Sequence, residues 1–526
     1  MQKLELTWIG KGDEPAVEPR ILLHNASKDY GDPTADNMLI HGDNLLALKA
    51  LEQEFAGRVK CIYIDPPYNT GSAFEHYDDN LEHSTWLSLM TPRLRILWNL
   101  LSEDGSIWLS IDDDEQAYLK VLCDEVFSRS SYVTAIVWQK RTSPDMRGTI
   151  SDGHDYILVY AKNPDAFKKS RNKLPLSEEQ ASNYNNPDND PRGAWTSADF
   201  TAQGYRPNQM YSITTPGGSV FSPPEGKCWK NIESVYLEQL AQGRFWFGAD
   251  GKAMPRRKTY LSEHEGVVPW TWWSNKEVGH NQEAKKEILA LFGAANVFDT
   301  PKPERLIQRI LTIASNPGDL TLDSFLGSGT TAAVAHKMGR RYIGIELGEH
   351  CYTHCLPRLK AVVDGEQGGI SKAQNWQGGG GFKFYELAPT LIVADKYGQP
   401  VINNKYNAQM LVAAIAKLNG YDYEPDADVF WKQGKGQDGS YIYVTTEYLT
   451  AAQLDNISRD LPEYERLLVC APAFDIGLGK RYENINVRKI PQSVLDKCEY
   501  GADNYNLNII NPPELDEAEW EDGEDA

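Results

Sequence analysis

A chain of 526 residues is too long for one ordinary hydrophobic core, so we expect about two to four domains. Its 41% hydrophobic and 24% charged residues are typical of soluble globular proteins. The sequence shows neither an apolar stretch of roughly 18 residues nor a signal-peptide core, which predicts a cytoplasmic protein with no membrane partner. The net charge of −21 argues against a uniformly basic surface, but residues 140–290 are nearly balanced in charge, so any nucleic-acid contact is expected there.

The first part of the chain alternates predicted strands and helices. Residues 38–41 form a short apolar run, and a helical pattern follows Gly42-Asp43. The β-branched and apolar stretch 59–64 predicts a buried strand that ends at Asp65-Pro66-Pro67-Tyr68, where two prolines prevent the strand from continuing. Further strands are expected at 106–111, 132–138 and 156–160. This alternation predicts an α/β fold with a mainly parallel sheet.

The pattern then changes twice. Residues 163–293 are rich in Pro, Gly, Asn and aromatic residues, which predicts a loop-rich separate domain. The α/β pattern returns over 294–365, with a helix face from Leu306 to Ala314 and strands at 320–322 and 342–345. We therefore expect residues 1–162 and 294–365 to form one domain together.

The C-terminal third contains three predicted segments. Residues 366–381 end in the run Gly378 to Gly381, which predicts a hinge or a close backbone approach. Residues 382–512 form a further α/β domain, and 513–526 form an acidic disordered tail. The seven cysteines are scattered, so we expect no disulfide framework, and Cys351 and Cys355 are expected to lie on a helix rather than to hold a metal.

A glycine loop follows the strand at 320–322, and an acid ends the next strand. The loop Asp323-Ser-Phe325-Leu-Gly327-Ser-Gly329-Thr330 lacks the lysine of a phosphate-binding loop. Glycines let the backbone pass close beneath a ligand, and Glu346 is placed to accept from a ribose hydroxyl. An aromatic face at Phe325 suits a cation such as a sulfonium. The pattern favours a nucleoside cofactor without a pyrophosphate.

The tetrapeptide at 65–68 adds a second chemistry. The Asp65 carboxylate and the Pro66 carbonyl can accept hydrogen bonds from the exocyclic amine of a nucleobase, and Pro67 stiffens the loop. Tyr68 offers an aromatic plane on which an extruded base can stack. Two such motifs at the ends of strands of one α/β unit are far more specific than either alone.

Together these motifs resemble those of the DNA amino-methyltransferases, with D-P-P-Y as catalytic motif and F-x-G-x-G as cofactor motif. The catalytic motif comes first, as in the β class. The resemblance implies a Rossmann-like sheet with circularly permuted motif order, the cofactor S-adenosyl-L-methionine, and a target-recognition domain at 163–293. It also implies a cofactor site, and its residues are Asp43, Lys302, Pro303, Asp323, Phe325, Gly327, Gly329, Thr330 and Glu346.

More narrowly, the chain resembles the modification subunit of type III restriction-modification systems. The resemblance is carried by Arg192 to Trp195, Pro223 to Gly226, Phe245 to Gly248, Lys258 to Leu261 and Gly378 to Leu387. It implies methylation of adenine N6 in double-stranded DNA by a homodimer that associates with a helicase-nuclease subunit.

The residues leave other functions open. The same apparatus would serve cytosine N4, an RNA or protein methyltransferase, an orphan enzyme without a nuclease, or a non-catalytic DNA-binding subunit. Candidates for phosphate or base contact are the basic residues Lys140, Arg141, Arg256, Arg257 and Lys258. The aromatic residues at 195–273 are expected mostly in a core.

Overall fold

The computed structural model describes residues 5–12, 17–69, 83–144, 146, 149–293, 298, 300–394, 397 and 400–490. The chain divides into two compact units, one of residues 1–172 with 270–526 and one of residues 173–269. The acidic tail expected at 513–526 lies outside the described residues.

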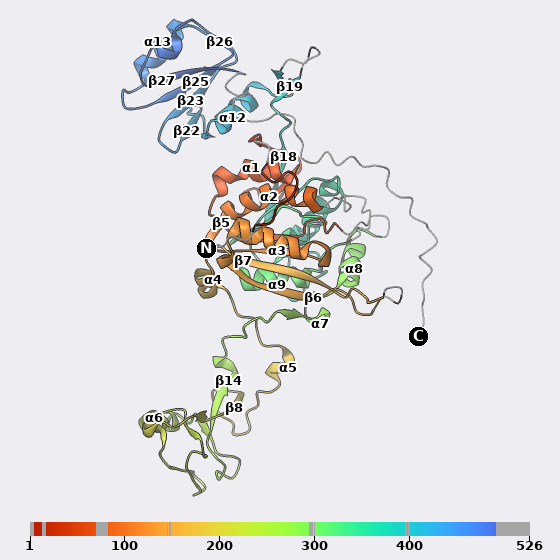
Figure 1. The fold of residues 1–526 in the computed structure, drawn as a ribbon, viewed down its shortest axis with the longest axis vertical. Helices are drawn as coiled ribbons and strands as arrows, with labels where there is room; N and C mark the ends of the chain where they lie inside the picture. The colour runs from red at the N-terminus through yellow and green to blue at the C-terminus, as the bar shows by residue number, and fades with distance from the viewer. Residues whose placement is uncertain are drawn as a thin grey trace. The chain divides into compact units, whose positions relative to one another are not determined.

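A large mixed sheet forms the centre of the first unit (Figure 1). Its strands, in spatial order, are β1 (Leu22–His24), β18 (Gly381–Leu387), β3 (Met38–His41), β17 (Arg341–Glu346), β16 (Leu320–Asp323), β4 (Val59–Ile64), β5 (Leu101–Ile111), β7 (His154–Ala161), β6 (Tyr132–Gln139) and β15 (Trp272–Trp273), and β2 (Tyr30–Gly31) pairs with β18. From β18 to β5 every neighbouring pair is parallel, whereas β7 is antiparallel to both β5 and β6.

Helices cover both faces of this sheet, which explains why its middle strands β4, β16 and β17 are buried along almost their whole length. All six residues of β4 are buried. The helices α1 (Asn44–Phe55), α2 (His83–Leu100) and α3 (Asp113–Phe127) pack side by side and share a core with alternate residues of the strands. The helices α9 (Glu304–Ala314), α10 (Thr330–Lys337) and α11 (Leu356–Val363) form a second packed group, and α9 contacts β4 and β5.

The order of the strands confirms the expected α/β class and the permuted motif order. The strand β16, which carries the glycine loop, follows β4 by more than two hundred residues in the sequence, yet the two strands are parallel neighbours, with Thr321 opposite Cys61 and Leu322 opposite Ile62. Because parallel strands end at the same edge, the loops at Asp65 and Asp323 emerge side by side.

The second unit, residues 173–269, has little regular structure. Its elements are α5 (Glu178–Ala181), β8 (Trp195–Asp199), β9 (Thr201–Gln203), β10 (Ile213–Thr214), β11 (Val220–Phe221), β12 (Lys227–Trp229), α6 (Glu233–Ala241), β13 (Phe245–Trp246) and β14 (Arg256–Tyr260). Its core is aromatic and contains Phe200, Trp229, Tyr236, Phe245 and Phe247. A unit with so few helices and strands is held together mainly by these rings.

The boundaries of this unit are narrower than the predicted segment 163–293. Helix α4 (Pro164–Ser170) contacts β5, and the chain returns to the central sheet at β15, which pairs with β6. Helices α7 (Asn275–Val278) and α8 (Asn281–Phe292) therefore belong to the first unit. A two-residue strand such as β15 has no periodicity that the sequence could reveal.

The glycine run at 378–381 brings two backbones together. A Cβ atom on Gly381 would lie 2.4 Å from the amide nitrogen of Asp32, and one on Gly380 would lie 2.8 Å from Nε2 of His336. Gly381 also begins β18, which is a strand of the central sheet. The central sheet thus extends to Leu387, beyond the predicted boundary at 381.

The region beyond β18 builds its own sheet. Its elements are β19 (Ile392–Ala394), β20 (Pro400–Ile402), α12 (Ala408–Leu418), β21 (Tyr421–Tyr423), β22 (Gly434–Gly436), β23 (Tyr441–Val444), β24 (Tyr448–Leu449), α13 (Ala451–Asp460), β25 (Leu467–Ala471), β26 (Ala473–Phe474) and β27 (Ile485–Lys489). Five of these strands form a sheet in the order β21-β22-β23-β25-β27. None of the described helices has the length and apolar character needed to cross a membrane.

Candidate active site

The loop after β4 places the Asp65 carboxylate and the Tyr68 ring at the carboxyl edge of the sheet. The indole Nε1 of Trp86, which is fully buried in α2, donates to the Pro67 carbonyl at 2.8 Å and fixes the loop. Asn69 has a φ of 62°, a left-handed conformation that asparagine tolerates well, and its Nδ2 donates to Glu115 Oε1 at 2.7 Å. The loop is therefore held by contacts with α2 and with α3.

The glycine loop after β16 is organised by Asp323. Its carboxylate accepts from the Phe325 amide at 2.9 Å and from the Thr331 hydroxyl at 2.6 Å. Gly327 and Gly329 have φ values of 55° and 83°, which side chains disfavour, and Gly329 is the N-cap of α10. Both glycines of the motif are thus required by the backbone itself.

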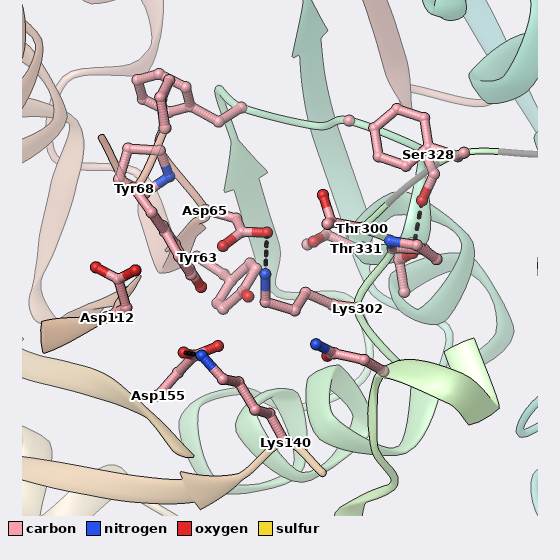
Figure 2. Close-up of a pocket in the computed structure, with 18 of the residues that line it drawn as sticks. Tyr63, Asp65, Tyr68, Asp112, Lys140, Asp155, Thr300, Lys302, Ser328 and Thr331 are labelled. Carbon is pink, nitrogen blue, oxygen red and sulfur yellow. Dashed lines mark hydrogen bonds and ion pairs between the residues drawn. The ribbon is translucent and has the colours of Figure 1, made fainter. Parts of the chain in front are cut away.

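The two loops open into one cavity of about 570 Å³ (Figure 2). The lining residues come from the catalytic loop, the glycine loop, the edges of β5, β6 and β7, and the segment before α9. They are Tyr63, Asp65, Pro66, Pro67, Tyr68, Asp112, Asp113, Asp114, Lys140, Arg141, Asp152, Asp155, Asn281, Phe298, Thr300, Pro301, Lys302, Asp323, Phe325, Leu326, Gly327, Ser328, Thr330 and Thr331. Most of the residues of both predicted motifs therefore line the same cavity.

Lys302, a predicted cofactor-site residue in the segment before α9, contacts the catalytic loop. Its ammonium lies 2.5 Å from Asp65 Oδ2 and 4.9 Å from the centre of the Tyr68 ring. The other carboxylate oxygen, Asp65 Oδ1, is buried and accepts no hydrogen bond from the part of the chain that the structure describes. A buried acceptor without a donor is unfavourable, so this oxygen is suited to a ligand N–H.

Burial controls the charge of the cavity. It raises the pKa of Asp323 to about 7, against the opposing hydrogen bonds from Thr331 and Phe325, with the Asp65 charge adding to the rise. Burial, with Asp114 nearby, likewise raises the pKa of Asp112 to about 7. Burial and the Asp65 charge raise the pKa of the Tyr68 phenol well above its ordinary value, so the ring is neutral. More aspartate than lysine and arginine side chains line the cavity, so it suits a cationic ligand.

Two predicted cofactor residues act behind the cavity wall. Glu346 accepts from the amides of Gly327 at 2.7 Å and Gly348 at 3.0 Å, and its carboxylate lies 2.8 Å from Nε2 of His350. Burial would raise the pKa of Glu346, but these contacts lower it, so the group is a carboxylate. Asp43 accepts from the Leu46 amide at 2.9 Å and caps α1. Neither side chain lines the cavity, although Glu346 shapes the loop that does.

The segment before α9 is tied to the glycine loop by buried charges. Pro303 is the N-cap of α9, and the next residue, Glu304, pairs with Lys337 at 2.7 Å and with Arg358 at 2.9 Å. Arg358 in turn donates to the Thr330 hydroxyl at 2.8 Å. The side chains of all three charged residues are at most 2% exposed. This network fixes Lys302 and Thr330 relative to one another.

The five predicted DNA-contact residues have different surroundings. Lys258 is buried, and its ammonium pairs with Asp188 and, at 2.8 Å, with Asp190, which argues against a phosphate contact. Arg256 and Arg257 are exposed on β14. Lys140 is buried in the cavity wall, and exposed Arg141 also lines the cavity, so neither lies on a separate basic face.

Sequence reasoning missed several residues of this cavity. Asp112 is the N-cap of α3, and its side chain also lines the cavity. Asp155 directly precedes the predicted strand at 156–160 and belongs to no recognisable motif. Its position directly opposite Trp138 in the antiparallel pair β6–β7 could not be predicted without the register.

Comparison with known proteins supports what the geometry indicates. Residues 59–355, which contain both motifs, match the family model of the N6/N4 DNA methylases. The chain belongs to this DNA methylase family. It is 34% identical to a protein of Haemophilus influenzae described as a probable type III restriction-modification enzyme Mod subunit, HindVI, over 69% of the chain and 55% of that protein.

Other relatives differ in how much of their length is covered. The type II methyltransferase M.EcaI of Enterobacter cloacae is 30% identical over 66% of the chain and 72% of that protein. A solved putative DNA modification methylase of Thermus thermophilus, complexed with S-adenosyl-L-methionine, is 16% identical, with a TM-score of 0.31 over 61% of the chain and 92% of that structure. The chain spans about half the length of the first Mod subunits that it matches.

The two cysteines of the 351–355 segment lie in a π-helical turn, both as buried free thiols. Cys355 Sγ donates to the Gly327 carbonyl at 3.0 Å, so it supports the glycine loop. Within the described ranges no three His, Cys, Asp or Glu side chains are grouped as a metal site requires.

Proposed function

We propose that the chain transfers a methyl group from S-adenosyl-L-methionine to the N6 amine of an adenine in double-stranded DNA. The observation that carries this proposal is the shared cavity of the Asp65 loop and the glycine loop, at the ends of two parallel neighbouring strands. One loop offers acceptors for an amine, and the other offers a close-approach backbone for a nucleoside. Transfer between the two needs only that both ligands meet in this cavity.

The catalytic loop would act mainly by orienting the amine. The target base leaves the stack, which costs a few kcal/mol, and Tyr68 stacks against it. Asp65 Oδ1, which is unpaired among the described residues, and the Pro66 carbonyl accept its two N–H groups. Alignment of the lone pair with the methyl group supplies much of the rate.

The glycine loop and its surroundings fit the cofactor. S-adenosyl-L-methionine supplies an electrophilic methyl group on a sulfonium. Phe325, Gly327, Gly329 and Thr330 would border it, Asp323 would face its positive charge, and Lys302-Pro303 would hold its methionine part. Glu346 would act indirectly by keeping Gly327 in place, and Asp43 would act through the start of α1, which it caps.

The affinity for this cofactor is expected to fall as the pH is lowered from 8 to 6. Cation binding favours the Asp323 carboxylate, whose pKa of about 7 in the free protein means that it must lose a proton on binding below that pH. The dissociation constant should rise up to about tenfold per pH unit below 7. Calorimetry across this range measures the effect.

Two variants test whether Asp323 causes the pH dependence of cofactor affinity. Asp323→Asn should flatten it, whereas Asp112→Asn, which removes a second carboxyl with a pKa of about 7, should leave it unchanged. A slope that survives in Asp323→Asn would contradict the assignment.

We further propose that the chain is the modification subunit of a type III system, in which a homodimer associates with a helicase-nuclease subunit. Its likeness to the HindVI Mod subunit supports this. The unit 173–269 would recognise the target sequence, because it presents exposed Arg256 and Arg257 on β14. Purification of the chain with and without the candidate partner, followed by light scattering, tests both assemblies.

The reaction is tested by expressing the chain in a methylation-free host and sequencing the genomic DNA for modified bases, with Asp65→Ala as the inactive control. N6-methyladenine in one sequence context, absent from the control, would support the proposal. N4-methylcytosine would change the base and keep the mechanism. DNA without any modification would contradict methyl transfer to DNA by this chain.

A further inference from the structure

Lys140 presents a buried ammonium to the catalytic cavity (Figure 2). It directly follows β6, and its residue is 8% exposed. Its Nζ lies 2.6 Å from Asp152 Oδ2 and 2.7 Å from Asp155 Oδ1, and Asp155 is 2% exposed. These three side chains line the same cavity as Asp65 and Tyr68.

The pair is poorly explained as a device for stability. Moving two charges out of water is unfavourable, and a buried ion pair rarely stabilises a fold better than apolar residues of the same volume. Burial alone would lower the pKa of Lys140, but Asp155 and Asp152 raise it, so the group stays a cation. The fold thus maintains a charged donor in the same cavity as the catalytic acceptors.

Two carboxylates hold the Lys140 ammonium and leave one of its N–H donors for a ligand. An ammonium has three N–H donors, and Asp152 and Asp155 accept two of them. Lys302, the other lysine of the cavity wall, lies on the catalytic carboxylate itself. Lys140 has carboxylates of its own, so its position does not depend on what Asp65 binds.

This arrangement complements the edge of an aminated base. In adenine and in cytosine the exocyclic amine, a donor, stands next to a ring nitrogen, an acceptor. Asp65 Oδ1 and the Pro66 carbonyl satisfy the amine, but a ring nitrogen in a closed cavity also needs a donor. We propose that Lys140 is a specificity-determining residue that donates to the ring nitrogen beside the target amine, with Asp155 and Asp152 as positioning residues.

The proposal rests on the proposed function, and base analogues test it. Duplexes containing the methylated sequence are prepared with 1-deazaadenine or 7-deazaadenine at the target position, each of which lacks one ring acceptor flanking the amine. If the target is cytosine, 3-deazacytosine is used. We expect kcat/KM of the wild type to fall about 10- to 100-fold on one analogue, which identifies the nitrogen.

Lys140→Met should remove this discrimination. Its kcat/KM on the natural base should be lowered by a similar factor, and the sensitive analogue should be no worse a substrate than the natural base. A purely structural role would instead lower turnover on all bases alike and preserve their ratio. Discrimination that persists in Lys140→Met, or a wild type indifferent to all analogues, would overturn the inference while the proposed function stands.

Lys258→Met provides a matched control for lost stability. Lys258 is also a buried lysine held by two carboxylates, but it lies in the unit 173–269 and not in the cavity. The Lys258→Met substitution should alter stability as Lys140→Met does. It should leave the ratio of kcat/KM on the natural base to kcat/KM on the analogue at the wild-type value. A changed ratio in Lys258→Met would overturn the assignment to Lys140, and a wild type that methylates no base would overturn the proposed function and this inference together.

Discussion

Replacing Asp65 with alanine is expected to slow methyl transfer on the order of 10³-fold, because the substitution removes the acceptor that orients the target amine. One oxygen of this carboxylate, Oδ2, is held by Lys302, and the loop itself should persist through the Trp86–Pro67 contact. Single-turnover kinetics with saturating DNA measures the chemical step directly.

A measurement of cofactor affinity distinguishes the loss of the Asp65 acceptor from a folding defect. Asp65→Ala should still bind S-adenosyl-L-methionine, and binding is expected to be no weaker, because Lys302 loses a competing carboxylate. Asp65→Asn keeps one acceptor oxygen and should retain more activity than the alanine variant. Near-normal turnover in Asp65→Ala would show that another group accepts from the amine.

Replacing Glu304 with leucine is expected to destabilise the protein by about 3–5 kcal/mol, since it leaves Lys337 and Arg358 as buried cations short of a carboxylate. Because Arg358 also holds Thr330, the damage should extend to the glycine loop. Hydrogen exchange of the amides at 325–331 should accelerate, and the midpoint of chemical denaturation should fall.

An exposed ion pair gives the matched comparison. Glu265 pairs with Lys173 at 2.6 Å, but its side chain is 81% exposed. Glu265→Leu should therefore change stability by less than about 1 kcal/mol. Equal effects of the two substitutions would mean that the buried network does not support the loop.

The strands and both motifs of the site could be predicted from the sequence, because their patterns are local. Five of the six residues of Val59–Ile64 are apolar or aromatic, and Gly327 and Gly329 stand where the backbone has positive φ. That their loops meet followed from the rule that parallel strands end at one edge, and the pairing of β16 with β4 confirmed it.

The remainder of the cavity depends on long-range register. Lys140 looked like one basic residue among several, and only the antiparallel pairing of β6 with β7 brings it to Asp155. Likewise, the two residues of β15 are too few to show a strand pattern, and their pairing with β6 makes them a strand. That the five basic residues contact DNA, and that residues 163–293 recognise the target sequence, stay predictions.

The position of β18 limits how the chain can be shortened. This strand lies between β1 and β3, so a fragment ending before Gly381 would leave the backbone N–H and C=O groups of β3 without a partner on that side. Unpaired edges of apolar strands recruit further strands from other molecules. Fragments designed for expression should therefore retain the residues up to Leu387, and those cut at the glycine run are expected to aggregate.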